Sequence, residues 1–423
     1  MANKNHAEIM SPAGSFECLA AAIKAGADSV YFGVEHLNMR ARAANNFKLS
    51  NLPKISKICK ENDVKSYLTV NTILYDHDLS LMKKLIDAAK AAGVTAIIAS
   101  DIAAISYAHS VGIEVHISTQ LNVSNIEAVK FYSQYADVVV LARELSIQQI
   151  KKICDDIKTK NICGPAGELV KIELFAHGAL CVSISGKCYM SLATYNASAN
   201  RGLCLQNCRR AYKVTDEETG VELVVDNKYI MSPKDLCTIG FIDKILEAGV
   251  SVLKIEGRGK KADYVYTVTK VYREAADCYL NGKSDGKYIS YTKEKIDAWT
   301  KRLEEVYNRG FWHGGYYLGK KLGEWSNAAG SKATKEKIYV GKAKNYFSKS
   351  KVGEFIIEAD KIKVGDEVII TGPTTGFVEG KVSSISSGDK AVNIAGKGAD
   401  ITIPIKEKIR KNDKLFVVVE RSA

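Results

Sequence analysis

The amino-acid sequence predicts an α/β fold: a (β/α)₈ barrel of the TIM type followed by a small C-terminal β-barrel domain. Over about the first 280 residues, short runs rich in valine and isoleucine alternate with amphipathic stretches, a pattern typical of repeated βα units. From Ile338 onward the pattern changes to short alternating strands separated by glycine, aspartate and serine, which favours a separate all-β unit. A length of 423 residues accommodates both units.

Eight stretches have the length and apolar content of buried parallel strands. In chain order they are Ile9–Pro12, Ser29–Gly33, Ser66–Asn71, Ala96–Ser100, Glu114–Ser118, Val138–Ala142, Lys171–His177 and Val252–Glu256. Helices are predicted after them at Phe16–Lys24, Leu52–Glu61, Leu79–Ala92, Ile102–Ser110, Ile126–Gln134, Ile147–Ile157, Ile239–Ala248 and Ala262–Leu280. Eight strand and helix pairs are the number that closes a barrel of this type.

About sixty residues separate the seventh strand from the seventh helix, far more than an ordinary βα loop contains. This insertion, residues 178–237, therefore lies on the face where such barrels carry their active sites. We divide the chain into the barrel with its insertion (1–282), a helical and aromatic connector (283–335) and the C-terminal β-barrel (336–423), a module that could hold RNA.

The insertion contains four cysteines that could hold a metal centre: Cys181, Cys188, Cys204 and Cys208. A set of thiolates selects soft metals such as zinc, copper(I) or the iron of iron–sulfur clusters. Zinc sites usually contain CxxC pairs, whereas the gaps here are six, fifteen and three residues. The wider spacing favours an iron–sulfur cluster, of the [4Fe–4S] kind. Free or disulfide-bonded thiols are the alternative, and disulfides are not expected because MANKNHAEIM lacks the apolar core of a secretory signal.

Cys237 lies at the far end of the insertion and is an alternative fourth ligand in place of Cys208. We prefer the compact set of four. The remaining cysteines lie mostly on helix-like stretches and are predicted to be buried as small apolar residues; they are Cys18, Cys59, Cys154, Cys163 and Cys278.

Polar side chains end several predicted strands and should meet at the barrel mouth. They are Asn71, Ser100, Asp101, Thr119, Gln120, Arg143, Glu144, His177, Glu256 and Arg258. Helix capping is the alternative for Ser100 and Asp101. The candidate catalytic residues are Arg143, His177, Glu256 and Arg258. Arg143 and Arg258, with Arg40 or Arg42, could bind a dicarboxylate, because a guanidinium donates two parallel hydrogen bonds to a carboxylate.

The charge balance favours a polyanionic partner such as RNA, because 60 lysines and arginines exceed 48 aspartates and glutamates. No apolar run approaches the length of a membrane span, so no membrane association is expected. Ten cysteines without a signal peptide indicate a reducing compartment, and hence a cytoplasmic location.

The connector is rich in aromatic residues interleaved with basic ones: Phe311, Trp312, Tyr316, Tyr317 and Trp325 with Arg309, Lys320 and Lys321. These rings could stack on unpaired bases. Alternatively they pack as a seam between the two domains, which is the arrangement that we expect.

Several segments together resemble the collagenase-like peptidase family U32. They are FAHGALCVSISGKCYMS, ANRGLCLQNCRRAY, SPAGS, SPKDLC and KIEGR. The members most similar to this chain are implicated in RNA hydroxylation, notably in making 5-hydroxyuridine at the tRNA wobble position with an iron–sulfur cluster and prephenate. Others hydroxylate a ribosomal RNA cytidine or ubiquinone precursors. The resemblance thus implies tRNA as partner and prephenate as co-substrate; because some relatives act in pairs, a homologous partner subunit is also conceivable.

Two other functions compete with tRNA hydroxylation. The first is the peptidase activity of the family name, but the sequence contains neither an HExxH zinc helix nor a GxSxG elbow. His177 and Cys181 could form a Cys–His pair, which would leave the other cysteines of the insertion without a role. The second is a non-catalytic RNA-binding scaffold with a structural cluster. Polar strand ends at the mouth of a complete barrel favour an enzyme.

Overall fold

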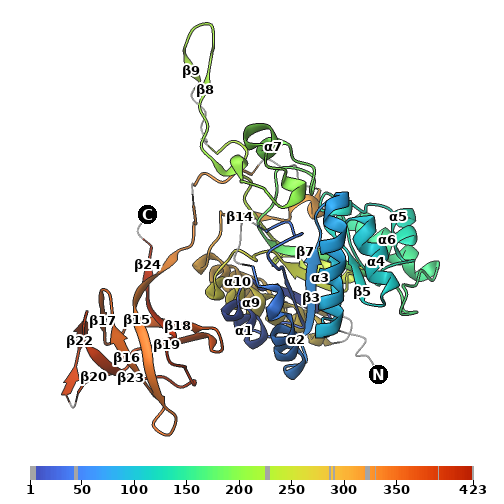
Figure 1. The fold of residues 1–423 in the computed structure, drawn as a ribbon. Helices are drawn as coiled ribbons and strands as arrows, with labels where there is room; N and C mark the ends of the chain where they lie inside the picture. The colour runs from blue at the N-terminus through green and yellow to red at the C-terminus, as the bar shows by residue number, and fades with distance from the viewer. Residues whose placement is uncertain are drawn as a thin grey trace.

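The computed structural model describes residues 6–41, 46–223, 229–284, 287–288, 291–319, 324–328, 330–388 and 390–421. A ring of parallel strands surrounded by helices forms the larger part, and an antiparallel β domain lies beside it (Figure 1). The predicted residue Arg42 lies outside the described residues.

The barrel strands are β1 (Glu8–Pro12), β2 (Ser29–Phe32), β3 (Lys65–Val70), β4 (Ala96–Ala99), β5 (Glu114–Ile117), β6 (Val138–Val140), β7 (Lys171–Gly178) and β11 (Val252–Ile255). Each pairs in parallel with its neighbours in chain order. Strand β11 pairs with both β7 and β1, which closes the ring. The prediction of a (β/α)₈ barrel is therefore confirmed.

The surrounding helices are α1 (Phe16–Lys24), α2 (Leu52–Glu61), α3 (Leu79–Ala92), α4 (Ile102–Ser110), α5 (Ile126–Tyr132), α6 (Ile147–Thr159), α8 (Ile242–Glu247) and α9 (Ala262–Asn281). Their apolar faces and the outer faces of the strands form one continuous core. Asp101 caps α4 by accepting a hydrogen bond from the N–H of Ala103, so the capping alternative is confirmed for this residue. None of the described helices combines the length and apolar character needed to cross a membrane.

The insertion after β7 folds over the carboxyl ends of the strands, and in Figure 1 it lies above the ring. It contains α7 (Met190–Tyr195) and a projecting hairpin of β8 (Val214–Thr215) and β9 (Glu222–Leu223). It ends in β10 (Asp235–Cys237), which runs antiparallel to β7 and parallel to β14 (Phe311–His313). The connector therefore returns to the barrel and extends its sheet, a pairing that we did not predict.

The rest of the connector contains β12 (Lys283–Ser284), β13 (Lys287–Tyr288), α10 (Lys293–Glu305) and the short helix η6 (Gly315–Leu318). Its aromatic residues Phe311, Trp312 and Tyr317 are buried, so these rings are not available to stack on bases. They are packed, but on the barrel and not as the seam between domains that we expected: Phe311 and Tyr317 belong to the barrel core, and β14 pairs with β10.

The C-terminal domain consists of β15 (Lys335–Phe347), β16 (Val352–Ile357), β17 (Lys361–Lys363), β18 (Glu367–Gly372), β19 (Gly376–Lys381), β20 (Ile385–Ser387), β21 (Lys390–Val392), β22 (Ile394–Gly396), β23 (Asp400–Pro404) and β24 (Lys414–Glu420). Most of these strands form one antiparallel sheet around its own apolar core. The domain packs on the barrel through Phe377, whose ring stacks on Tyr266 of α9 at 4.4 Å. Lys337 adds an ion pair of 2.6 Å to Asp263.

Candidate active site

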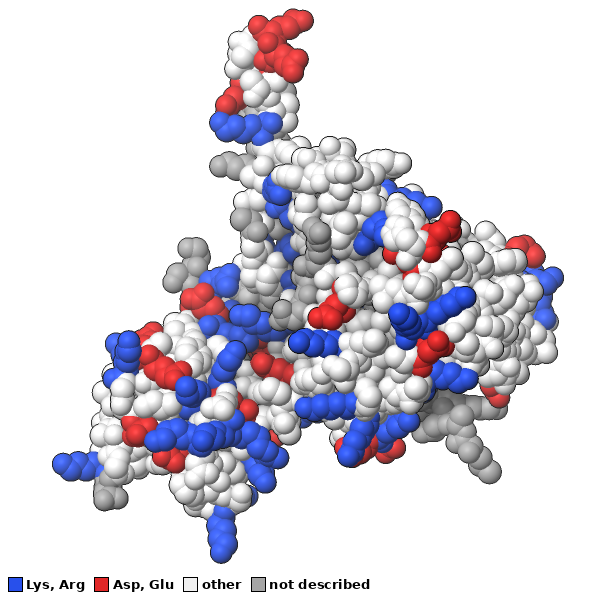
Figure 2. Space-filling model, viewed as in Figure 1, with Lys and Arg blue, Asp and Glu red and all other residues white. Residues whose placement is uncertain are grey.

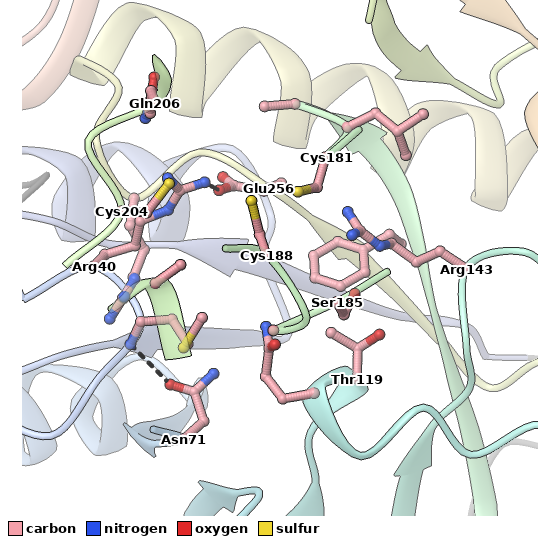
Figure 3. A pocket seen from close by; sticks show the side chains of 18 of the residues that line it. Arg40, Asn71, Thr119, Arg143, Cys181, Ser185, Cys188, Cys204, Gln206 and Glu256 are labelled. Carbon is pink, nitrogen blue, oxygen red and sulfur yellow. Dashed lines mark hydrogen bonds and ion pairs between the residues drawn. The ribbon is translucent and has the colours of Figure 1, made fainter. Parts of the chain in front are cut away.

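The barrel mouth contains a cavity of about 200 Å³, which lies between the carboxyl ends of the strands and the insertion. Asn71, Thr119, Arg143 and Glu256, from the ends of β3, β5, β6 and β11, line one side (Figure 3). The insertion lines the other side. Polar residues from separate strands thus line one cavity, as the barrel topology predicts.

All four cysteines of the compact set line this cavity. Figure 3 shows the sulfur atoms of Cys181, Cys188 and Cys204 directed into it. Burial raises the pKa of the Cys208 thiol, the neighbouring Arg209 lowers it, and the other three thiols raise it further. The Cys208 thiol is therefore close enough to the other three to respond to their charge. No disulfide joins any of the ten cysteines.

Arg209 and two glycines fix the cysteine loop over the barrel. The Arg209 guanidinium donates to the carbonyls of Leu180 at 2.5 Å and Pro233 at 2.6 Å, which ties the two ends of the insertion together. Gly202 has a φ of +80°, and a Cβ there would lie 2.3 Å from the carbonyl oxygen of Asn38. Gly186 has a φ of +75° and similarly lies against Gln120. Only glycine permits this close approach.

The alternative ligand Cys237 does not line the cavity. It is fully buried in the core between strands and helices, and burial raises its pKa to about 12. The structure thus groups Cys208, and not Cys237, with the other three thiols.

The four thiols are soft donors that could hold a metal ion or a cluster. Among the described residues, no three His, Cys, Asp or Glu side chains lie close enough to share one metal ion. In a zinc site each sulfur is about 2.3 Å from the metal, so the sulfurs crowd together. A [4Fe–4S] cluster binds its thiolates through different iron atoms and therefore accepts a more widely spaced set.

Glu256 and Arg40 form an ion pair of 2.6 Å at the cavity wall. Burial alone would raise the pKa of Glu256, but the positive charge of Arg40 outweighs this and lowers the pKa. Glu256 is therefore ionised at neutral pH. Among the described residues that line the cavity, it is the one carboxylate.

The Arg258 guanidinium is already hydrogen-bonded to other side chains of the protein. Its two terminal nitrogens donate to Oγ1 of Thr69 and Oδ1 of Asn38, each at 2.8 Å. Burial lowers its pKa to about 10, so it remains cationic at neutral pH. The guanidinium that we expected to bind a ligand thus holds the loop after β2 against β3.

Arg143 is placed differently, because it lines the cavity without a hydrogen-bond or ion-pair partner among the described residues. The guanidinium of Arg143 can therefore donate hydrogen bonds to a ligand. Of the predicted arginines that the structure describes, Arg143 is thus the one left available for a carboxylate.

The structure does not bring His177 to the cavity. Its side chain is buried on the outer side of β7, where Nδ1 lies 3.3 Å from the hydroxyl of Tyr272. The rings of Tyr264 and Phe311 pack beside it. Burial lowers the pKa of His177 to about 3, so the imidazole is neutral at physiological pH.

Residues 14–327 match the model of peptidase family U32. The chain belongs to this family. A protein named collagenase from Porphyromonas gingivalis is 57% identical over 414 residues, which are 98% of both chains. The tRNA hydroxylation protein P1 of Bacillus subtilis is 35% identical over 309 residues, 71% of this chain and 69% of that protein. The 23S rRNA 5-hydroxycytidine C2501 synthase of Escherichia coli is 35% identical over 279 residues, 66% of this chain and 40% of that protein.

The buried His177 should make this U32 protein less stable in acid. Its folded-state pKa of about 3 lies below its ordinary value of 6.5, so between these values the unfolded chain binds a proton that the folded chain does not. The free energy of unfolding should therefore fall as pH decreases from 6.5 to 3, by about 1.4 kcal/mol per pH unit. His177→Phe should reduce this slope in urea titrations at several pH values. The exposed His109→Phe is the control, and an unchanged slope for His177→Phe would contradict the assignment.

Lys254 also lines the cavity of this U32 protein, which we did not predict. Its ammonium pairs with the buried carboxylate of Glu173 at 2.7 Å and lies 4.7 Å from the ring centroid of Tyr31. The signal was present, because strand alternation puts Lys254 on the same side as Val252 and Glu256. A lysine that faces the inside of a barrel strand requires a partner.

Proposed function

We propose that this U32 protein hydroxylates a pyrimidine of RNA, namely the wobble uridine of a tRNA, to give 5-hydroxyuridine. The observation that carries the proposal is that four thiols and the unpaired Arg143 share one cavity at the barrel mouth. A redox cofactor and an anionic co-substrate could thus be held side by side. Relatives named for tRNA hydroxylation and for 5-hydroxycytidine synthesis in ribosomal RNA support the same class of reaction.

In this proposal Cys181, Cys188, Cys204 and Cys208 would hold a [4Fe–4S] cluster. The neighbouring Arg209 would offset its negative charge, and no acidic residue occurs between 174 and 215. When bound, such a cluster supplies electron transfer next to the substrate. Because none of the ten cysteines is in a disulfide, the proposal also places the protein in the reducing cytoplasm.

The co-substrate in this proposal is a dicarboxylate, for which the family resemblance implies prephenate. Arg143 would bind and orient one carboxylate through two parallel hydrogen bonds. Replacing the C5–H bond of uridine by C5–OH adds one oxygen atom and removes two electrons, so the proposal takes the co-substrate as the oxygen donor, which is reduced by those two electrons. Glu256, kept ionised by Arg40, would accept the C5 proton inside the cavity and return it to the product. The insertion would exclude bulk water from this reaction.

The test is to replace Arg143 with alanine and to measure 5-hydroxyuridine in tRNA by mass spectrometry while prephenate is varied. Loss of a charge-assisted bidentate contact is expected to lower kcat/KM by roughly 100-fold, mainly through a higher KM for prephenate. Arg143→Lys should recover part of the loss, since it keeps the charge without the fork. Arg302→Ala, on α10 and outside the cavity, is the control. An unchanged KM for prephenate in Arg143→Ala would remove this residue from the site.

The second candidate is a peptidase, which the relative named collagenase favours at 57% identity. The site offers little for peptide hydrolysis. No histidine lines the cavity among the described residues, and His177 is 3.3 Å from Tyr272 and buried away from the thiols. We expect no cleavage of denatured collagen by the purified protein. Cleavage that is lost in Cys181→Ala and persists in iron-free protein would favour the peptidase.

A further inference from the structure

Large side chains that face solvent gather around the mouth of the cavity. On the insertion and on the loop after β3 they are Ile73, Tyr75, Ile184, Tyr189, Tyr195 and Leu205. Tyr189 is the most exposed of them, at 78%, although its chain neighbours Cys188 and Met190 both line the cavity. A single exposed ring is ordinary, but a group of exposed large side chains beside a cavity is typical of a binding surface.

Two of these rings are already stacked by arginine. The guanidinium carbon of Arg201 lies 4.1 Å from the ring centroid of Tyr75, and that of Arg210 lies 5.2 Å from the ring centroid of Tyr195. The two tyrosines are still 53% and 47% exposed. In each pair the arginine therefore covers one part of the tyrosine ring and leaves the rest exposed to solvent. The exposed part has a planar cation beside it. We call Tyr75, Tyr189, Tyr195, Arg201 and Arg210 the stacking rim.

The charge of the insertion, which carries Tyr189, Tyr195, Arg201 and Arg210, suits a polyanion, whereas the Tyr75 loop also carries Asp78, the ion-pair partner of Arg201. Residues 174–215 contain no Asp or Glu and five basic residues. In Figure 2 the insertion below the projecting hairpin is mostly white, and acidic side chains appear at the tip of the hairpin. Acidic side chains repel phosphates, so a surface that binds nucleic acid should lack them. A protein partner that binds an exposed aromatic surface does not require this. The surface thus favours nucleic acid over a peptide.

From the sequence we considered the aromatic residues of the connector for base stacking. In the structure the stacking rim is the better candidate. The connector rings Phe311, Trp312 and Tyr317 are buried, so they cannot meet a base. The rim rings are exposed and border the cavity in which the proposed reaction takes place. An RNA base that enters an enzyme cavity leaves its stack, and its neighbours then lose a stacking partner.

We propose that the stacking rim binds the unpaired bases of an RNA loop next to the base that enters the cavity. This rests on the proposed function and specifies the form of its substrate: a single-stranded loop and not a duplex. Tyr189 stacks one base at the cavity edge. The Arg210–Tyr195 pair stacks a base further out, and the exposed Arg210 contacts the phosphate beside that base. Tyr75 stacks a further base; Arg201 holds its ring and is itself paired with Asp78.

The experiment measures fluorescence anisotropy of a labelled RNA hairpin with an unpaired loop, and of a fully paired duplex of the same length, bound to the anaerobically purified full chain. The wild type should prefer the hairpin. Tyr189→Ala and Tyr195→Ala should each weaken hairpin binding on the order of tenfold, the effect of losing one base–aromatic stack, with little effect on the duplex. Tyr189→Phe should bind like the wild type, because stacking needs the ring and not the hydroxyl.

The matched control is Phe131→Ala, since Phe131 on α5 is also half exposed but lies outside the rim. Equal hairpin binding by Tyr189→Ala, Tyr195→Ala and Phe131→Ala would overturn the rim and leave RNA hydroxylation untouched. Rim-dependent hairpin binding without any hydroxylation would support the rim and overturn the proposed reaction. If the wild type binds no RNA but binds denatured collagen through Tyr189, both proposals are wrong.

Discussion

Replacing Cys208 with alanine is expected to abolish both the proposed iron content and the proposed RNA hydroxylation activity, whereas Cys237→Ala should keep both. Cys208 lines the cavity with three other thiols, and a cluster with one ligand missing is readily lost. Cys237 lies in the core, where its removal leaves only a small cavity that costs about 1 kcal/mol. Iron, acid-labile sulfide and the visible spectrum of anaerobically purified protein provide the measurement.

The wild type should contain about four irons and four sulfides per chain, as a [4Fe–4S] cluster requires. The alanine variants of Cys181, Cys188 and Cys204 should behave like that of Cys208. If Cys237→Ala lost its iron and Cys208→Ala kept it, Cys237 would be the fourth ligand in place of Cys208. Stoichiometric zinc in the wild type would contradict the redox proposal altogether.

The barrel could be predicted because its strands are short continuous apolar runs and its helices have regular amphipathic patterns. These are local signals, and the helix predicted at Leu79–Ala92 has the same bounds in the structure. The position of the insertion followed from counting strands. By contrast, β14 is only three residues long, and its pairing with β10 depends on a partner more than seventy residues away, 235 against 311 in register. No local pattern shows such a contact.

The orientation of His177 shows a second limit. Glu173 and Phe175 face the inside of the barrel, so strict alternation predicts His177 there as well. The register between β7 and β11 shifts between Lys254 and Ile255, however, and skips Ala176. A bulge of this kind redirects the side chains that follow it, and His177 packs outward onto α9. Sequence alone does not reveal the bulge.

The arginines show a third limit, which concerns partners. Arg143 and Arg258 were equivalent candidates at the ends of two strands. Their difference depends on atoms that lie far away in the sequence. Oγ1 of Thr69 and Oδ1 of Asn38 accept hydrogen bonds from Arg258, whereas Arg143 has no such partner in the part of the chain that the structure describes. Three-dimensional proximity decides which charge is available to a ligand.

Lys254→Met is expected to lower the free energy of unfolding by about 3–5 kcal/mol, because it leaves the carboxylate of Glu173 buried without its partner. Glu173 has no exposed surface, and its Oε2 lacks a hydrogen bond among the described residues. The nearest basic atom left would be Nδ1 of His116 at 4.0 Å. Urea denaturation of the variant measures the loss.

The double variant Lys254→Met with Glu173→Gln should recover most of that stability, since no buried charge remains. The matched control is Lys151→Met, which breaks an exposed pair with Asp155 of 2.9 Å on α6 and should cost no more than about 0.5 kcal/mol. If Lys254→Met cost as little as this control, the pair would not be effectively buried. Although the double variant should regain stability, its activity should stay below that of the wild type. It lacks the positive charge that Lys254 places at the cavity where the anionic co-substrate is proposed to bind.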